Sequence, residues 1–391
     1  MPIEESTSLA RRVALWRDHP AITSGIAAFS AGVFESARAL SPFWLGLSAV
    51  ALLACASALA ACSSSSSSPS SSSAKLTGFG GSSTVSHPQW SQYSFVIGDN
   101  GGDGSQALAK ITGAFASAPY KVTYARFTYG PPLIQAAASG DIDLGSVGDV
   151  PPITGAAQEY GFSVVGVAHY INTTVPDEDI IVPKGSSIKT AAELKGKKIA
   201  VPQGSSAHGL VLLALKNVGL TPSDVHLDFL SPAAGATAFA SGKVDAWAIW
   251  NPQVSLALQQ GARILVKGLP PNDQISNYYV APNRDLTGAR RAAFTDLFER
   301  LSGEFAWANK HPDEYAQALS QEDGISLADA KAVVPSSEFW IAPVASSDVQ
   351  AEQTLADAFL QAGQIKKAVN IASISTNVLP AGYDSMNTPG T

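Results

Sequence analysis

Short apolar runs alternate with helix-like repeats along most of the chain. The apolar runs predict strands at 93–98, 121–127, 142–147, 164–168, 180–182, 198–201 and 245–250. Helical spacing predicts helices at 105–116, 131–139, from 151 onward, 207–218, 287–309, 313–320 and 347–364, and Thr190–Glu193 reads as a capping box. This order of elements predicts an α/β fold with largely parallel sheets.

The N-terminal part of the chain reads as an export signal. Residues 43–61 carry no charge, Arg38 precedes them, and Leu59-Ala60-Ala61-Cys62 ends the run. This ending resembles the lipobox of bacterial lipoproteins, which predicts lipidation of Cys62 after removal of residues 1–61. Residues 63–73 are serine except Pro69, as in a flexible tether. An uncleaved membrane anchor, or lipidation at Cys55, are the alternatives, and translation starting at Val33 would explain the long leader.

Composition limits the possible functions. The 391 residues are 46% apolar and 15% charged, which excludes a chain disordered throughout. The net charge of −7 argues against a nucleic-acid partner, because phosphate binding needs basic residues. Two cysteines, Cys55 and Cys62, exclude a disulfide framework and a cysteine zinc site. The histidines show no metal-ligand spacing, so neither metal nor cofactor is expected.

Three junctions between a strand and a helix have open backbones, at 129–132, 148–152 and 204–208. Ligands of open α/β sheets bind where strands end and helices begin. Helix N-termini attract anions through free N–H groups and the helix dipole. Any one of these junctions could be an ordinary capped turn, but three together favour an anion-binding cleft.

Around these junctions the chain resembles the aliphatic sulfonate-binding proteins of bacterial ABC importers. The similarity runs from about 94 to 371, and its pieces are 130–134, 139–143, 148–153, 181–184, 194–200, 204–208 and 242–252. Two of these pieces narrow the resemblance to the sulfonate, nitrate and taurine branch of the family. They are Gly148-Asp149-Val150-Pro151-Pro152 and Trp247-Ala248-Ile249-Trp250.

The resemblance implies a two-lobed periplasmic binding-protein fold that closes around its ligand. Lobe one would comprise 93–178 and 281–378, lobe two 179–280, and the crossings would lie near 177–180 and 278–281. Residues 62–92 would form the tether and 379–391 a tail. The expected partners are a sulfonate anion, an importer permease and the membrane, through the lipid. The protein would act as a monomer in sulfur acquisition, on the outer face of the cytoplasmic membrane.

The expected ligand-binding residues are Asp99, Asn100, Gly130, Gly148, Asp149, Ser205, Ser206, His208, Trp250 and Asn251. Trp247 and Trp250 would face opposite sides of a strand, with Trp250 in the cleft. Tyr279 and Trp340 are weaker candidates.

Three positions depart from the family's pattern. Ala234 and Ala236 stand where the family has Asp and Arg, and Asn251 stands where it has Asp. The ligand could therefore be another small molecule, such as nitrate, taurine or an aromatic or heterocyclic compound.

Catalysis is less well supported than binding. A hydrolase would pair Ser205 or Ser206 with His208, but the spacing is not the Gly-x-Ser-x-Gly of a nucleophile elbow. An enzyme relative that makes the thiamine pyrimidine relies on a cysteine cluster that this chain lacks. A purely structural lipoprotein is a further alternative.

His208 lies in the first turn of its helix, where the helix dipole favours the neutral imidazole. Ligand binding should therefore vary little between about pH 6 and 8.

Overall fold

The computed structural model describes residues 88–101, 104–274 and 276–385, all within one compact unit. The predicted signal, Cys62 and most of the predicted tether lie outside these residues. Within the described part, no helix is both long enough and apolar enough to cross a bilayer.

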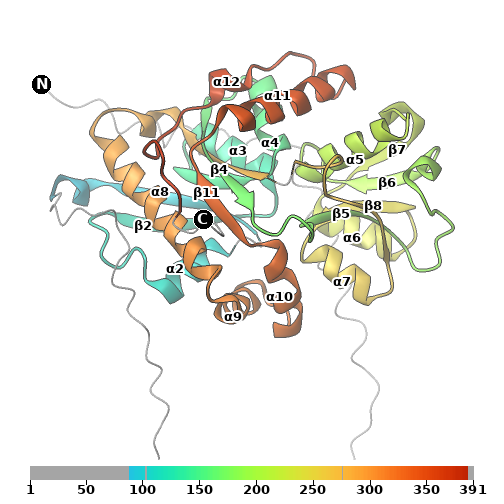
Figure 1. The fold of residues 1–391 in the computed structure, drawn as a ribbon, viewed down its shortest axis with the longest axis horizontal. Helices are drawn as coiled ribbons and strands as arrows, with labels where there is room; N and C mark the ends of the chain where they lie inside the picture. Colours follow the sequence, from blue (N-terminus) through green and yellow to red (C-terminus); the bar gives the residue numbers. More distant parts are fainter. Residues whose placement is uncertain (1–87, 102–103, 275, 386–391) are drawn as a thin grey trace, which may run out of the picture. The chain divides into compact units, whose positions relative to one another are not determined.

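Two mixed sheets organise the chain (Figure 1). The first has the order β11-β4-β10-β3-β1-β2, in which β1 runs parallel to β2 and β3, while β10 and β11 run antiparallel to their neighbours. Its strands are β1 Ser94–Asn100, β2 Lys121–Phe127, β3 Leu144–Val147, β4 Phe162–Tyr170, β10 Ser276–Pro282 and β11 Phe339–Ala342.

The second sheet has the order β7-β6-β8-β5-β9. Here β6 runs parallel to β7 and β8, and β5 runs antiparallel to β8 and β9. Its strands are β5 Glu178–Val182, β6 Lys198–Val201, β7 His226–Phe229, β8 Ala246–Trp250 and β9 Arg263–Lys267. The α/β fold with two sheets is as predicted, although antiparallel pairs are more frequent than expected.

The described helices are α2 Ser105–Thr112, α3 Gly130–Ser139, α4 Val150–Ala157, α5 Ser206–Asn217, α6 Pro232–Ala240, α7 Gln253–Gln259, α8 Gly288–Ala308, α9 Pro312–Asp323, α10 Leu327–Val333, α11 Ser346–Gln361 and α12 Ile371–Ile374. Seven of these described helices (α2, α3, α4, α5, α8, α9 and α11) begin close to predicted positions, whereas α6, α7, α10 and α12 were not predicted. Helix α2 ends before the predicted 116, because Gly113 adopts a left-handed conformation at φ 66° and caps it. The predicted capping box at Thr190 is confirmed.

The long helix α8 packs against the first sheet with the face that its sequence predicts. Phe294, Leu297 and Leu301 are fully buried in the same core as Phe95 of β1.

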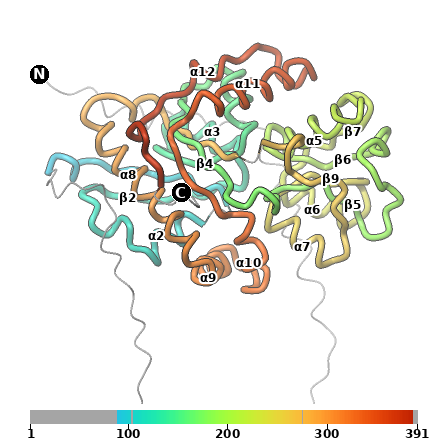
Figure 2. The backbone as a smooth tube through the Cα atoms, in the orientation of Figure 1, coloured from blue at the N-terminus to red at the C-terminus, as the bar shows by residue number. Residues whose placement is uncertain are grey.

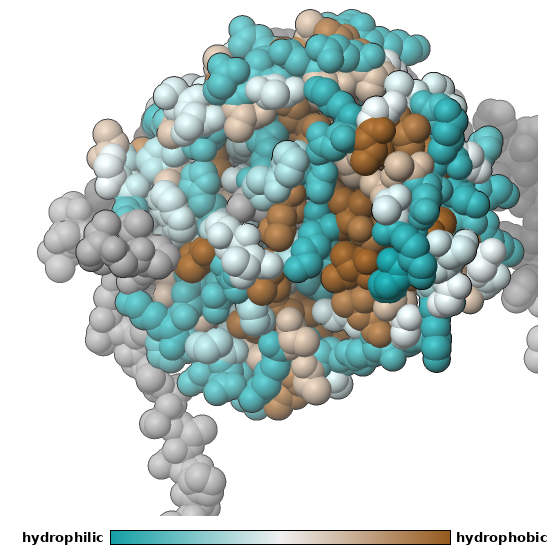
Figure 3. All heavy atoms as spheres, turned by 45° about the vertical axis from the view of Figure 1, so that its right-hand side comes forward, coloured by the Kyte–Doolittle hydropathy of each residue, from teal (hydrophilic) through white to brown (hydrophobic). Residues whose placement is uncertain are grey.

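The space-filling view shows hydrophobic residues gathered in the middle of one face, with hydrophilic residues around them (Figure 3).

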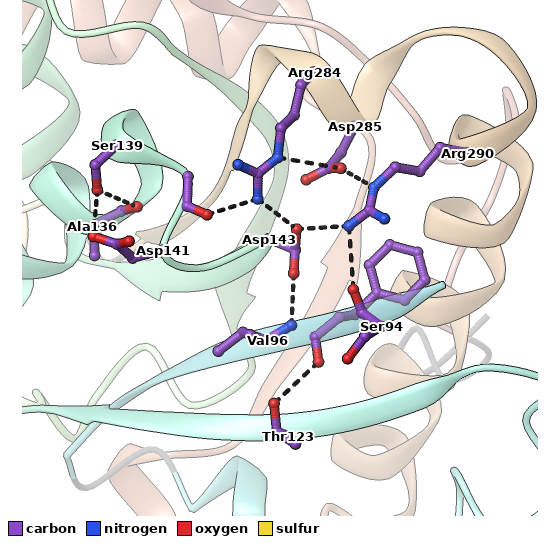
Figure 4. A network of polar contacts seen from close by, with 12 residues as sticks. Ser94, Val96, Thr123, Ala136, Ser139, Asp141, Asp143, Arg284, Asp285 and Arg290 are labelled. Carbon is purple, nitrogen blue, oxygen red and sulfur yellow. Dashed lines mark hydrogen bonds and ion pairs between the residues drawn. The ribbon is translucent and has the colours of Figure 1, made fainter. Parts of the chain in front are cut away.

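A buried carboxylate ties α8 to the first sheet (Figure 4). One Asp143 oxygen accepts from the Val96 N–H at 2.6 Å, and the other accepts from Arg284 at 3.0 Å and Arg290 at 2.8 Å. Arg290 also pairs with the buried Asp285. Three segments distant in sequence, around Val96, Asp143 and 284–290, are thereby fixed around one carboxylate.

The chain leaves the first sheet after β4 and returns to it at β10 (Figure 2). The return comes earlier than the expected crossing at 278–281, since pairing with β4 begins at Ser276. Tyr278 and Tyr279, expected in the crossing, are instead buried in the first sheet.

Candidate functional site

The three predicted junctions meet at one cavity of about 70 Å³. Gly130 at the start of α3 and Gly148 before α4 line it from the first sheet's side, and Ser205 and Ser206 line it from α5. Asn100, Trp250 and Asn251 also line it. Seven of the ten expected ligand-binding residues are thus brought together by both halves of the fold.

Helix α5 begins at this cavity with two N–H groups that precede its own hydrogen-bond ladder. Its first internal bond is His208 N–H to Ser205 O at 3.0 Å, which leaves the N–H groups of Ser206 and Ala207 ahead of it. The first turns of α3 and α4 each hold two prolines, which have no N–H to donate. The three helix dipoles still favour an anion between them.

The two serine hydroxyls are not free donors in this structure. The Ser205 hydroxyl donates to the Pro202 carbonyl at 2.7 Å, and the Ser206 hydroxyl donates to Glu178 Oε2 at 2.6 Å. In this conformation neither Ser205 nor Ser206 directs its hydroxyl hydrogen into the cavity.

Strand β8 places its two tryptophans on opposite faces, as its period requires. Trp247 is buried and packs against Phe239 with 5.6 Å between the ring centroids, whereas Trp250 lines the cavity. Of the weaker candidates, Tyr279 is buried against Phe298, and Trp340 packs against His169.

Three expected residues do not line this cavity. Asp99 is buried at the end of β1. His208 faces a separate cavity of about 630 Å³, where its Nδ1 accepts from the Gly204 N–H at 3.3 Å. Burial lowers the pKa of His208 to about 4, so it is neutral at pH 7, as expected.

The third, Asp149, occupies the residue position just before α4 and lines a small neighbouring cavity with Asp177, Glu178 and Asp273. Burial, then the nearby Asp273, raises the pKa of the Asp149 carboxyl well above its usual range. The same two causes, with Asp179, raise the pKa of Asp177 to about 7.

Sequence reasoning missed several residues that line the main cavity. They are Gly101, Ser146, Pro151, Tyr170, Asp177, Asn277, Val333, Ser336, Ser337 and Phe339. Tyr170 is the last residue of β4, and its position at the end of a strand is a signal that could have predicted it as a lining residue. Asn277 and Ser336 belong to segments that only tertiary pairing brings here.

The structure also shows where two of the three positions that depart from the family's pattern lie. Asn251 donates to Ser336 Oγ at 3.0 Å and accepts from the Ser255 hydroxyl at 2.8 Å, so it joins α7 to the segment after α10. Ala236 lines a separate pocket that also contains Arg126. None of the described residues lining the main cavity is a lysine or arginine.

Two α/β lobes with a polar cavity between them, rimmed by helix N-termini, define a two-lobed ligand-binding protein. The chain belongs to the NMT1/THI5-like family, which it matches over residues 107–315.

The relatives and solved structures agree with this class. Two curated relatives, from Escherichia coli and Bacillus subtilis, are named "Putative aliphatic sulfonates-binding protein". They are 43% and 30% identical, over 43% and 68% of this chain, and the match spans 53% and 79% of their own lengths. The alkanesulfonate-binding protein SsuA of Xanthomonas axonopodis pv. citri, solved with MOPS bound, superposes with a TM-score of 0.67 at 31% identity. That match covers 73% of this chain and 98% of the other.

Proposed function

We propose that the protein is an extracytoplasmic solute-binding protein that captures an organosulfonate anion and delivers it to an ABC importer. The observation that carries this proposal is the convergence of three helix N-termini from both lobes on one cavity. A sulfonate is an anion with oxygens on one end and an organic group on the other. Trp250, Tyr170 and Phe339 supply aromatic surface for that organic group.

We further propose that the protein binds its ligand without converting it. Ser206 donates to Glu178, Ser205 donates to Pro202, and His208 faces another cavity, so the hydrolase pairing has no support. The signal and Cys62 support a lipid anchor on the outer face of the cytoplasmic membrane, and a monomer suffices because one chain supplies both lobes.

Isothermal titration calorimetry tests the ligand class. Butanesulfonate should bind, and sulfate and nitrate should bind more weakly because they lack an organic group to contact the aromatic surface. Taurine tests whether an added ammonium group is tolerated beside Asp177. A folded protein that binds none of the sulfonates would refute the substrate class.

A further inference from the structure

Ser206 joins the ligand cavity to a buried acidic residue. It is the first residue of α5 and lines the cavity, and its Oγ lies 2.6 Å from Oε2 of Glu178, the first residue of β5. A serine hydroxyl carries one hydrogen. While that hydrogen is donated to a Glu178 carboxylate, only lone pairs of Ser206 are left to face the cavity, and lone pairs repel an anion.

Glu178 lies among other acids. Asp273, in the segment before β10, lines the same small cavity as Glu178, and its carboxyl raises the pKa of Glu178. Asp149 at the start of α4 faces it across the small cavity, and Tyr170 at the end of β4 borders the same space.

The neighbours of Glu178 along β5 bring no compensating charge. Asp177 lines both cavities, and Asp179 accepts from the Gly268 N–H and lies near Lys267 of β9. Among the described residues, none of the groups that act on Glu178 is a cation. Burial, then Asp273 and Asp149, raises the pKa of Glu178 well above its usual range, which favours the neutral carboxyl relative to an ordinary glutamate.

We propose that Glu178 is a positioning residue that takes up a proton when the anion binds, which reverses its hydrogen bond with Ser206. The protonated carboxyl donates to Ser206 Oγ, and the Ser206 hydrogen turns into the cavity toward the ligand. This inference rests on the proposed function. One proton passes from solvent to a Glu178 carboxylate oxygen, so an O–H bond forms there as the proton donor in solvent loses its own, and no bond between heavy atoms changes.

The sign of the pH dependence follows. The neutral acid binds the anion better, so affinity is highest where Glu178 is already protonated in the free protein. It falls by up to about tenfold per pH unit above the pKa of the free protein. Butanesulfonate is a suitable probe, because it stays ionised throughout and contributes no titration of its own.

The experiment is calorimetry of the full chain with butanesulfonate between pH 5 and 9, in buffers of different ionisation enthalpy, to count protons taken up. Glu178→Gln mimics the neutral acid, since its amide donates to Ser206. We expect it to bind as tightly as wild type at low pH, more tightly at high pH, and with one proton fewer taken up. Glu314→Gln, at an exposed position in α9, is the matched control and should behave as wild type.

Ser206→Ala separates this reversal from a general effect of charge. It should weaken binding at least tenfold at low pH and lose the same proton uptake, and combining it with Glu178→Gln should remove no further protons. Asp177→Asn should leave the proton uptake at Glu178 on ligand binding unchanged. The inference is overturned if Glu178→Gln retains the wild-type proton count, or if Ser206→Ala and Glu178→Gln each remove protons additively. If folded wild type binds no sulfonate at any pH, the proposed function fails and this inference fails with it.

Discussion

Replacing Gly148 with alanine should weaken ligand binding by preventing the lobes from meeting. Gly148 precedes α4 on the first lobe and faces Ser206 of the second. A Cβ added at Gly148 would lie 2.7 Å from Ser206 Cβ and 2.9 Å from Ser206 Oγ. Carbon atoms in contact prefer about 3.5–4.0 Å, so the two segments must separate by about 1 Å.

That separation sets the size of the effect. Overpacking a close contact costs about 1–3 kcal/mol. Here the cost falls on the closed, ligand-bound arrangement, because an open cleft relieves the contact. Affinity for butanesulfonate should therefore fall roughly 5- to 150-fold, at about 1.4 kcal/mol per factor of ten. The melting temperature should change much less, because neither lobe's core is altered.

The assay is calorimetry for affinity and small-angle scattering for compaction on binding. Gly161→Ala is the matched control, since an added Cβ there has nothing within 4 Å. Wild-type affinity and compaction in Gly148→Ala would refute the reasoning, because they would show that the bound lobes do not meet at Gly148 and Ser206.

Four further outcomes are expected. Cys62→Ser should abolish lipidation, and a lipid-modified N-terminus at that site by mass spectrometry would contradict the anchor. Trp250→Phe should remove much of the ligand-induced change in tryptophan fluorescence, whereas an undiminished change would place Trp250 outside the site. Asp177→Asn should raise sulfonate affinity above pH 7 and change it little below pH 6, since the wild-type carboxyl has a pKa of about 7 and repels the anion when ionised. Arg290→Ala should lower the free energy of unfolding by about 2–4 kcal/mol in urea, because Asp143 and Asp285 lose a shared cation; wild-type stability would contradict that role.

The local pattern of the sequence was enough to predict most elements and the helix N-termini that rim the cavity. Strands β2 and β6 and the start of α5 lie where the apolar runs and glycines indicate, and the alternation along β8 separates Trp247 from Trp250. These features depend on residues close together in the chain, so periodicity and capping chemistry describe them.

The strand partners and the charges of the site required the tertiary structure. Strand β10 belongs to the first sheet because it pairs with β3 and β4, partners more than a hundred residues away. The expectation of little pH dependence considered His208 alone, as the titrating group next to Ser206 in sequence. The fold instead places His208 in another cavity and brings Glu178 against Ser206, with Asp273 beside it. A residue's pKa and the direction of its hydrogen bond depend on the groups packed around it, and here those groups come from segments that only long-range strand pairing brings together.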